Sequence, residues 1–188
     1  MKRSRVMLGI LGGVILTAAV SAACSDSPLA PADDLALNVA GASVTVTSLT
    51  ATDVFTGLVD PGLVEVREYH FVARGVVVTS RITATDPRGT CNARITANEQ
   101  LLMADGSGQV WGKFECDADV GGVWVASWTG QREPGGAGVW IATIKVVGHG
   151  VGGAIDGLQL RAEELVYQNA PFLGPHFGQI TGTILQPN

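Results

Sequence analysis

The stretch CNARITANEQLLMADGSGQVWGKFEC, residues 91–116, decides the fold because it reads as two strands joined by a turn. Asp105-Gly106-Ser107-Gly108 has the residue types of a tight turn. On either side of it, small or apolar residues alternate with polar ones, and the alternating sets are Cys91, Ala93, Ile95, Ala97 and Val110, Gly112, Phe114, Cys116. A turn near Gly106 places the two cysteines on adjacent strands and on one face. The stretch therefore predicts an antiparallel hairpin bridged by Cys91 and Cys116.

The same pattern continues on both sides, from Ser43 to the end of the chain. Short alternating segments are separated by glycine, proline and aspartate turns, and together they predict about eight strands in an antiparallel meander. Glycines also lie inside the expected strands, at Gly75, Gly112, Gly178 and Gly182. Glycine inside a strand suits the bends of a closed sheet. We therefore expect a β-barrel over residues 43–188, with a β-sandwich as the alternative.

Residues 148–158, GHGVGGAIDGL, combine a glycine-rich turn with Asp-Gly-Leu at the start of a strand. With Gly178 and Gly182 in the final strand, this part of the chain resembles the later part of allene-oxide-cyclase-like and dirigent-like β-barrels. The resemblance implies an eight-stranded barrel with an apolar cavity, often assembled as dimers or trimers. No residue here matches the catalytic residues of those families, so none is carried over.

Residues 1–23 have the composition of a bacterial export signal. Lys2, Arg3 and Arg5 precede the uncharged apolar run 6–20, and small residues follow it. The ending Ser21-Ala22-Ala23-Cys24 resembles the lipobox of bacterial lipoproteins. That resemblance implies cleavage before Cys24 and lipidation of its sulfur, although the family prefers leucine where this chain has Ser21. Cleavage by an ordinary signal peptidase, or a retained membrane helix, are the alternatives.

Residues 24–42 are rich in small, acidic and proline residues and predict a flexible tether between the lipid and the domain. The resemblance to lipoproteins also concerns the residue after the cysteine. In Gram-negative members of that class, an aspartate at this position implies retention in the inner membrane. This chain has Ser25 there, which favours the outer membrane. Localisation in the cell envelope, with the lipid anchor as the contact to the membrane, is thus expected.

The charge and the cysteine content of the chain without its expected signal exclude some classes of partner and indicate the redox state of the compartment. The expected signal holds three of the 12 basic residues and none of the 17 acidic ones, so nine basic against 17 acidic residues remain, a formal charge of −8. Such a surface argues against nucleic acid as a partner. If Cys24 is lipidated, an even pair of cysteines remains, which in an oxidising compartment predicts a disulfide; two buried thiols are the alternative.

Four tryptophans fall on three consecutive expected strands, at Trp111, Trp124, Trp128 and Trp140. They can form a stacking platform for a glycan, line a cavity for an apolar small molecule, or pack in the core. The stretch 139–144 of the expected strand 139–147 is apolar on both faces, which favours cover from a second copy of the chain or from the N-terminal segment.

Ionisable candidates for chemistry are few. Glu68 and His70 are two residues apart and would share a strand face as a metal pair, an acid–base pair or a surface salt bridge. His149 lies between glycines in an expected loop, where a ligand can approach the backbone. No third metal ligand is visible near this pair, and the sequence has neither a Gly-x-Ser-x-Gly nucleophile nor a phosphate-binding loop. We therefore expect neither metal nor cofactor, and leave the catalytic residues unassigned.

Three hypotheses of function follow. The first is a lipid-anchored, non-catalytic binding or structural module; the second is an isomerase or lyase with an apolar barrel cavity; the third is an oligomeric surface protein. The interior of the barrel discriminates between them. A cavity holding a lone ionisable group favours an enzyme, whereas a filled interior favours a structural module.

Overall fold

A computed structural model of the chain describes residues 43–169 and 175–187. Within them the chain forms nine strands and two short 3-10 helices. The elements are β1 (Val44–Asp60), β2 (Leu63–Arg67), β3 (His70–Ala84), η1 (Pro87–Gly89), β4 (Cys91–Leu102), β5 (Gly108–Ala118), β6 (Val123–Gly136), β7 (Val139–Val151), η2 (Gly153–Ile155), β8 (Gln159–Gln168) and β9 (His176–Pro187). No helix in these two ranges is long and apolar enough to cross a membrane.

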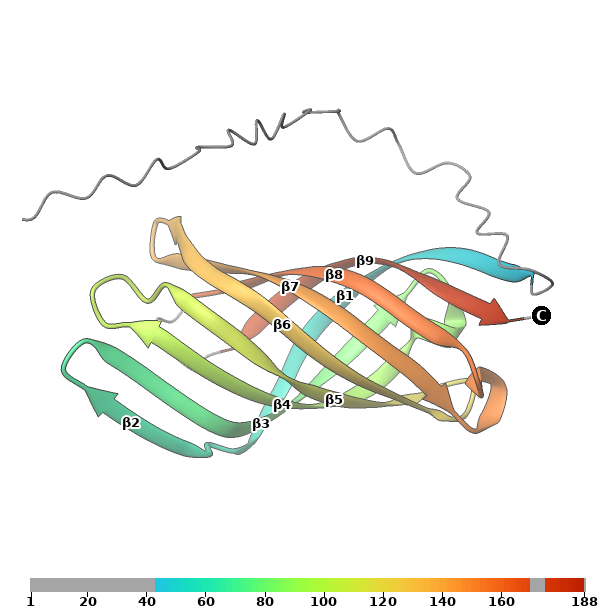
Figure 1. Cartoon of the computed structure of the whole chain (residues 1–188), viewed down its shortest axis with the longest axis horizontal. Helices are drawn as coiled ribbons and strands as arrows, with labels where there is room; N and C mark the ends of the chain where they lie inside the picture. Colours follow the sequence, from blue (N-terminus) through green and yellow to red (C-terminus); the bar gives the residue numbers. More distant parts are fainter. Residues whose placement is uncertain (1–42, 170–174, 188) are drawn as a thin grey trace, which may run out of the picture. The chain divides into compact units, whose positions relative to one another are not determined.

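The strands form a closed antiparallel barrel of eight strands, with β2 as an additional strand outside it (Figure 1). Strands β3 to β9 follow one another as neighbours, β9 pairs with β1, and β1 pairs with β3 to close the sheet. The β-barrel prediction is confirmed, and the β-sandwich alternative is wrong. Hairpins with short turns can only join antiparallel neighbours, which is why the turn chemistry of the sequence leads to a meander.

The β4–β5 hairpin confirms the opening prediction. Cys91 pairs with Ala118, and Cys116 pairs with Ala93, so the two cysteines are diagonal neighbours on the inner face. They form a disulfide with 5.6 Å between their Cα atoms. A loop of this length, closed by a sequence separation of 25 residues, contributes roughly 3 kcal/mol if its effect is mainly on the unfolded chain.

The disulfide belongs to a packed cluster that fills one end of the barrel. Buried side chains from five strands, from η2 and from the residue before β8 gather there, namely Leu49, Cys91, Cys116, Trp124, Ile155, Leu158 and Ile184. Trp124 exposes 1% of its surface, and its indole Nε1 donates a hydrogen bond to the Arg88 carbonyl oxygen at 2.7 Å. This end of the interior is therefore closed by core packing.

The glycine-rich segment 148–153 differs from the sequence prediction of a loop. β7 continues through Gly148 and Gly150 to Val151, and His149 pairs with Gln159 of β8. Gly148 and Gly150 face inward, where a Cβ would collide with Ala126 and with the carbonyl oxygen of Ile155. The two glycines therefore let a strand pass close to its neighbours, and the turn begins only after Val151.

Candidate functional site

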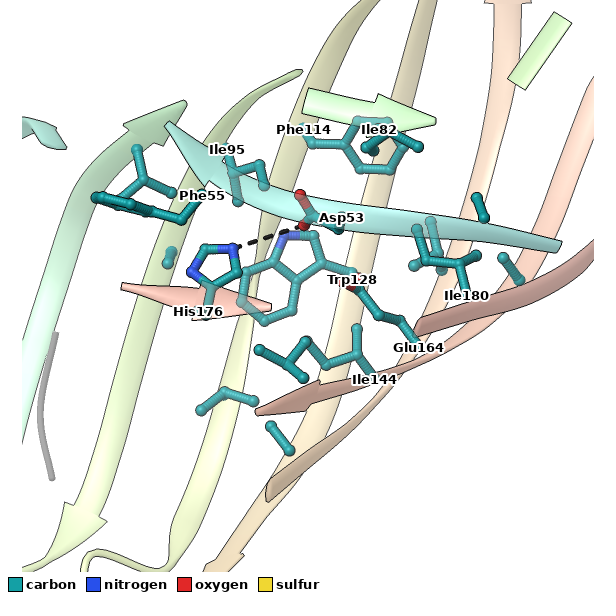
Figure 2. Close-up of a pocket in the computed structure, with 18 of the residues that line it drawn as sticks. Asp53, Phe55, Ile82, Ile95, Phe114, Trp128, Ile144, Glu164, His176 and Ile180 are labelled. Atoms are coloured by element: carbon teal, nitrogen blue, oxygen red, sulfur yellow. Dashed lines mark ion pairs between the residues drawn. The ribbon is translucent and has the colours of Figure 1, made fainter. Parts of the chain in front are cut away.

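The barrel encloses an apolar cavity of about 300 Å³ beside the packed end. Inward-facing residues of all eight barrel strands line it, because alternate residues of each strand point into a closed sheet. Apolar side chains form most of the wall, and among those drawn in Figure 2 are Phe55, Ile82, Ile95, Phe114, Trp128, Ile144 and Ile180. The size and lining are those of a site for a small organic molecule.

Five ionisable side chains interrupt this apolar wall. They come from five different strands, and they are Asp53, Glu99, Arg132, Glu164 and His176. Asp53 exposes 2% of its surface, Arg132 none and Glu164 9%. Isolated charges at such depth are strongly disfavoured unless they are paired or change protonation, so the contacts among the five decide what the cavity can do.

Asp53 of β1 and Glu164 of β8 approach each other over Gly178 of β9. Gly178 pairs with Asp53 on one side and with Val166 on the other, so it lies between the two carboxyl-bearing strands. A Cβ at this position would lie 3.0 Å from the Asp53 Cβ and would collide with the Glu164 carboxyl oxygen Oε1. The absence of a side chain at Gly178 therefore leaves the space that the two carboxyl groups occupy.

Burial raises the pKa of Glu164 well above its ordinary value, and the negative charge of Asp53 and a hydrogen bond to its carboxylate raise it further. Two carboxylates at one site cannot both ionise readily, so one proton is retained. Protonated Glu164 is a hydrogen-bond donor to Asp53 in this arrangement. The pair therefore favours holding one proton between two carboxyl groups inside an apolar cavity.

His176, the first residue of β9, extends the group beyond the carboxyl pair (Figure 2). Its Nε2 lies 3.5 Å from Asp53 Oδ2 and 3.4 Å from Ser80 Oγ. The imidazole also meets the edge of Phe55, with ring centroids 5.5 Å apart. His176 is thereby held in one orientation against Asp53, at the side of the cavity lined by Phe55 and Pro175.

Arg132 and Glu99 form a second charged pair at the wall of the cavity. Their closest atoms, Nη1 and Oε2, are 3.8 Å apart. The guanidinium lies over the ring of Trp140 at 5.5 Å, and Trp140 Nε1 donates to the Asp105 carbonyl oxygen at 2.8 Å. Burial raises the pKa of Glu99, against the opposing effect of the Arg132 charge. Arg132 is thus tied to Glu99 and to Trp140.

The four tryptophans, which the sequence places on three consecutive strands, do not lie together in the structure. Trp124 and Trp128 line the cavity, and the Trp128 Nε1 is buried without a hydrogen-bond partner within the described ranges. Trp140 packs against Arg132 at the wall, and Trp111 lies half-buried on the outer face of β5. A single platform of four rings is therefore not formed by one copy of the chain.

The remaining candidates lie away from the cavity. Glu68 falls in the two-residue turn between β2 and β3, so it does not share a strand face with His70, which begins β3. His149 is exposed on the outer face of β7. The outer face of β7 also leaves Val147 exposed in the single chain. No group of three or more His, Cys, Asp or Glu residues in the described part of the chain could hold a metal.

None of the five cavity residues was singled out from the sequence. For two of them, however, the position in the alternating pattern of the strand indicates a side chain that points inward. Glu164 continues the alternating set Leu158, Leu160 and Ala162, and Glu99 continues the set that begins at Cys91. A charge in the phase of an otherwise apolar inner face marks a buried ionisable group. The alternation and the prolines of the sequence predict a loop over residues 169–176, which includes His176, and a strand over residues 123–130, which ends before Arg132.

The raised pKa of Glu164 makes a prediction about stability. From the ordinary value of 4.5 up to the raised pKa, the folded chain binds more protons than the unfolded chain, so the free energy of unfolding falls as pH rises. We expect Glu164→Gln to remove the contribution of Glu164 to this decrease in the free energy of unfolding. That contribution is about 1.4 kcal/mol for each unit by which the pKa is raised. Urea denaturation across a pH series measures it.

Glu163→Gln is the matched control, because Glu163 is exposed and points outward at the neighbouring position of β8. It should keep the pH dependence of the unchanged protein. Glu99 contributes in the same direction, so a residual slope in Glu164→Gln is expected. Equal slopes for the unchanged protein and Glu164→Gln would contradict the assignment.

No protein-family model, no curated protein and no solved structure matches this chain. The resemblance to allene-oxide-cyclase-like and dirigent-like barrels therefore stays a prediction that rests on glycine spacing. What the cavity does has to be inferred from its geometry and charges alone.

Proposed function

We propose that this β-barrel binds a small, largely apolar molecule in its interior. The observation that carries the proposal is the cavity of about 300 Å³, walled by apolar side chains and furnished with a few buried polar groups. A filled barrel would instead have suggested a purely structural role. Apolar lining supplies affinity, and the few convergent polar groups supply orientation and selectivity.

An acid–base enzyme is a second candidate, favoured by the Asp53–Glu164 pair. An apolar carbonyl compound in the cavity could lose a proton from the carbon next to its carbonyl to Asp53. Its carbonyl oxygen would receive the proton of Glu164, giving an enol. In a compound whose enol is conjugated to a further double bond, Asp53 would return its proton to the far carbon of that system while the enol hydroxyl returned its proton to Glu164, which completes an isomerisation. Catalysis of this kind needs one carboxylate and one carboxylic acid side by side, which the raised pKa of Glu164 provides.

We further propose that the protein works in the bacterial cell envelope, anchored through a lipid on Cys24. Residues 1–42 lie outside the described residues, so support comes from the sequence and from the Cys91–Cys116 disulfide, which suits an oxidising compartment. An oligomeric surface protein remains an alternative, supported by the exposed Val147 on the outer face of β7.

Filling the cavity should abolish binding. Ala162 lines the cavity from β8, and Ala162→Phe would occupy it. We expect the affinity for a neutral apolar fluorophore, N-phenyl-1-naphthylamine, to fall by roughly tenfold or more, measured by fluorescence titration. Arg161→Phe places the same ring on the exposed outer face and should leave the titration unchanged. A folded Ala162→Phe protein that binds the probe normally would contradict interior binding.

The enzyme candidate can be tested without knowing its substrate. Enolisation exchanges hydrogen next to a carbonyl with solvent, so apolar ketones incubated in D₂O with the protein should gain deuterium, detected by mass spectrometry. Asp53→Asn should slow a true exchange by about 10²–10⁴-fold, whereas Glu163→Gln should not. Exchange that is absent, or that persists in Asp53→Asn, would argue against acid–base catalysis.

Lipidation is testable on the full chain produced in a bacterial host. Metabolic labelling with palmitate should mark the protein, and Cys24→Ala should lose the label and the membrane association. A cleaved chain that begins at Cys24 and carries no lipid would support export but contradict lipidation.

A further inference from the structure

The charges of the cavity are divided unequally between its two groups. Arg132 is the one Lys or Arg side chain among the described residues that line the cavity, and it lies beside Glu99. The other two carboxyl groups, Asp53 and Glu164, have His176 as their basic neighbour, 3.5 Å from Asp53. Acidic side chains therefore outnumber basic ones where β1, β8 and β9 meet.

Two carboxyl oxygens at this place have no hydrogen-bond partner among the described residues. They are Asp53 Oδ1 and Glu164 Oε1, and both are buried. More than nine-tenths of each of these side chains is shielded from solvent, and both face the cavity (Figure 2). Buried acceptors are nearly always satisfied in folded proteins. Their position indicates that a donor from a bound molecule completes them.

An aromatic ring faces the same cavity from the opposite wall. Trp128 of β6 lines the cavity, and Figure 2 shows its indole between His176 and Glu164. Tryptophan is the side chain whose ring face attracts cations most strongly. A carboxyl pair on one side and an indole on the other form a surrounding suited to a positively charged group. Gly178 keeps a Cβ out of the space that the carboxyl pair needs.

We propose that the ligand of this cavity is an amphipathic organic cation, an ammonium group on an apolar body. The ammonium would donate to Asp53 Oδ1 and Glu164 Oε1, and the apolar body would occupy the space lined by residues such as Ile95, Phe114 and Ile144. This inference rests on the proposed binding function and names the class of ligand.

A carboxylate ligand fits less well, because it would face Asp53 and Glu164 while Arg132 is already beside Glu99. A neutral alcohol is the closer rival. It can donate to one carboxyl oxygen and accept from the unpartnered Trp128 Nε1. An alcohol gains no net charge attraction from the pair, however, so the difference between an amine and an alcohol of equal length isolates the proposed interaction.

Binding of a cation should also depend on pH. An ammonium beside Asp53 favours ionised Glu164, so binding releases a proton wherever Glu164 is protonated in the unoccupied protein. Affinity should then rise with pH by up to about tenfold per unit until the pKa of Glu164 is passed. Glu99, Arg132 and His176 also face this space, and the alcohol serves as the reference for effects of pH that do not depend on the charge of the ligand.

The experiment compares octylamine, octanol and octanoate as competitors of the neutral fluorophore N-phenyl-1-naphthylamine on the full chain. At neutral pH we expect octylamine to compete at roughly ten- to a hundredfold lower concentration than octanol, and octanoate to be the weakest. Asp53→Asn and Glu164→Gln, which preserve shape, should remove most of the preference for the amine. Glu163→Gln should retain it.

Each outcome is decisive. Equal competition by octylamine and octanol, an amine preference that survives both variants, or a preference for octanoate would overturn the cation while leaving interior binding intact. Failure of the fluorophore and all three competitors to bind would overturn the binding function as well. An amine preference that rises with pH and is lost in Glu164→Gln supports the proposal.

Discussion

Closure of the sheet through the pairing of β1 with β3 is the constraint on which the other features depend. A closed antiparallel sheet has an inside, and alternate residues of every strand must face it. The packed end, with its disulfide, fills part of that interior, but the rest is left hollow. Every ionisable residue in inward phase is thereby held next to the cavity, regardless of where it lies in the chain.

Burying ionisable side chains lowers the free energy of unfolding, and the groups beside them offset this desolvation penalty only in part. Arg132 lies beside Glu99, and His176 lies beside Asp53. The raised pKa of Glu164 favours its protonated form, which avoids a second negative charge next to Asp53. Apolar residues of similar size would pack with less penalty. Polar groups kept inside an otherwise apolar cavity, with oxygens left unpartnered, are the pattern expected of a site that is completed by a ligand.

The sequence predicted what depends on local pattern. The hairpin of residues 91–116, the disulfide and the meander follow from alternation and turn chemistry, which act between near neighbours. The charged group depends on pairings between strands far apart in the chain, such as Asp53 with Gly178. It also depends on where strands end. Extending the sixth strand to Gly136 puts Arg132 in the inward phase, and beginning the ninth at His176 brings that imidazole to Asp53.

The proposed binding and the candidate catalysis would use the same site, and they differ in what would happen to the proton of Glu164. In the proposed complex, an ammonium that donates to Asp53 Oδ1 and Glu164 Oε1 favours ionised Glu164 and would displace its proton. A neutral carbonyl compound would instead accept that proton while Asp53 took another from carbon. The charge of the molecule that enters therefore decides which of the two occurs. A protein that retains a cation needs Glu164 ionised, whereas an enzyme needs Glu164 protonated beside an ionised Asp53, so the pH at which the barrel works discriminates between them.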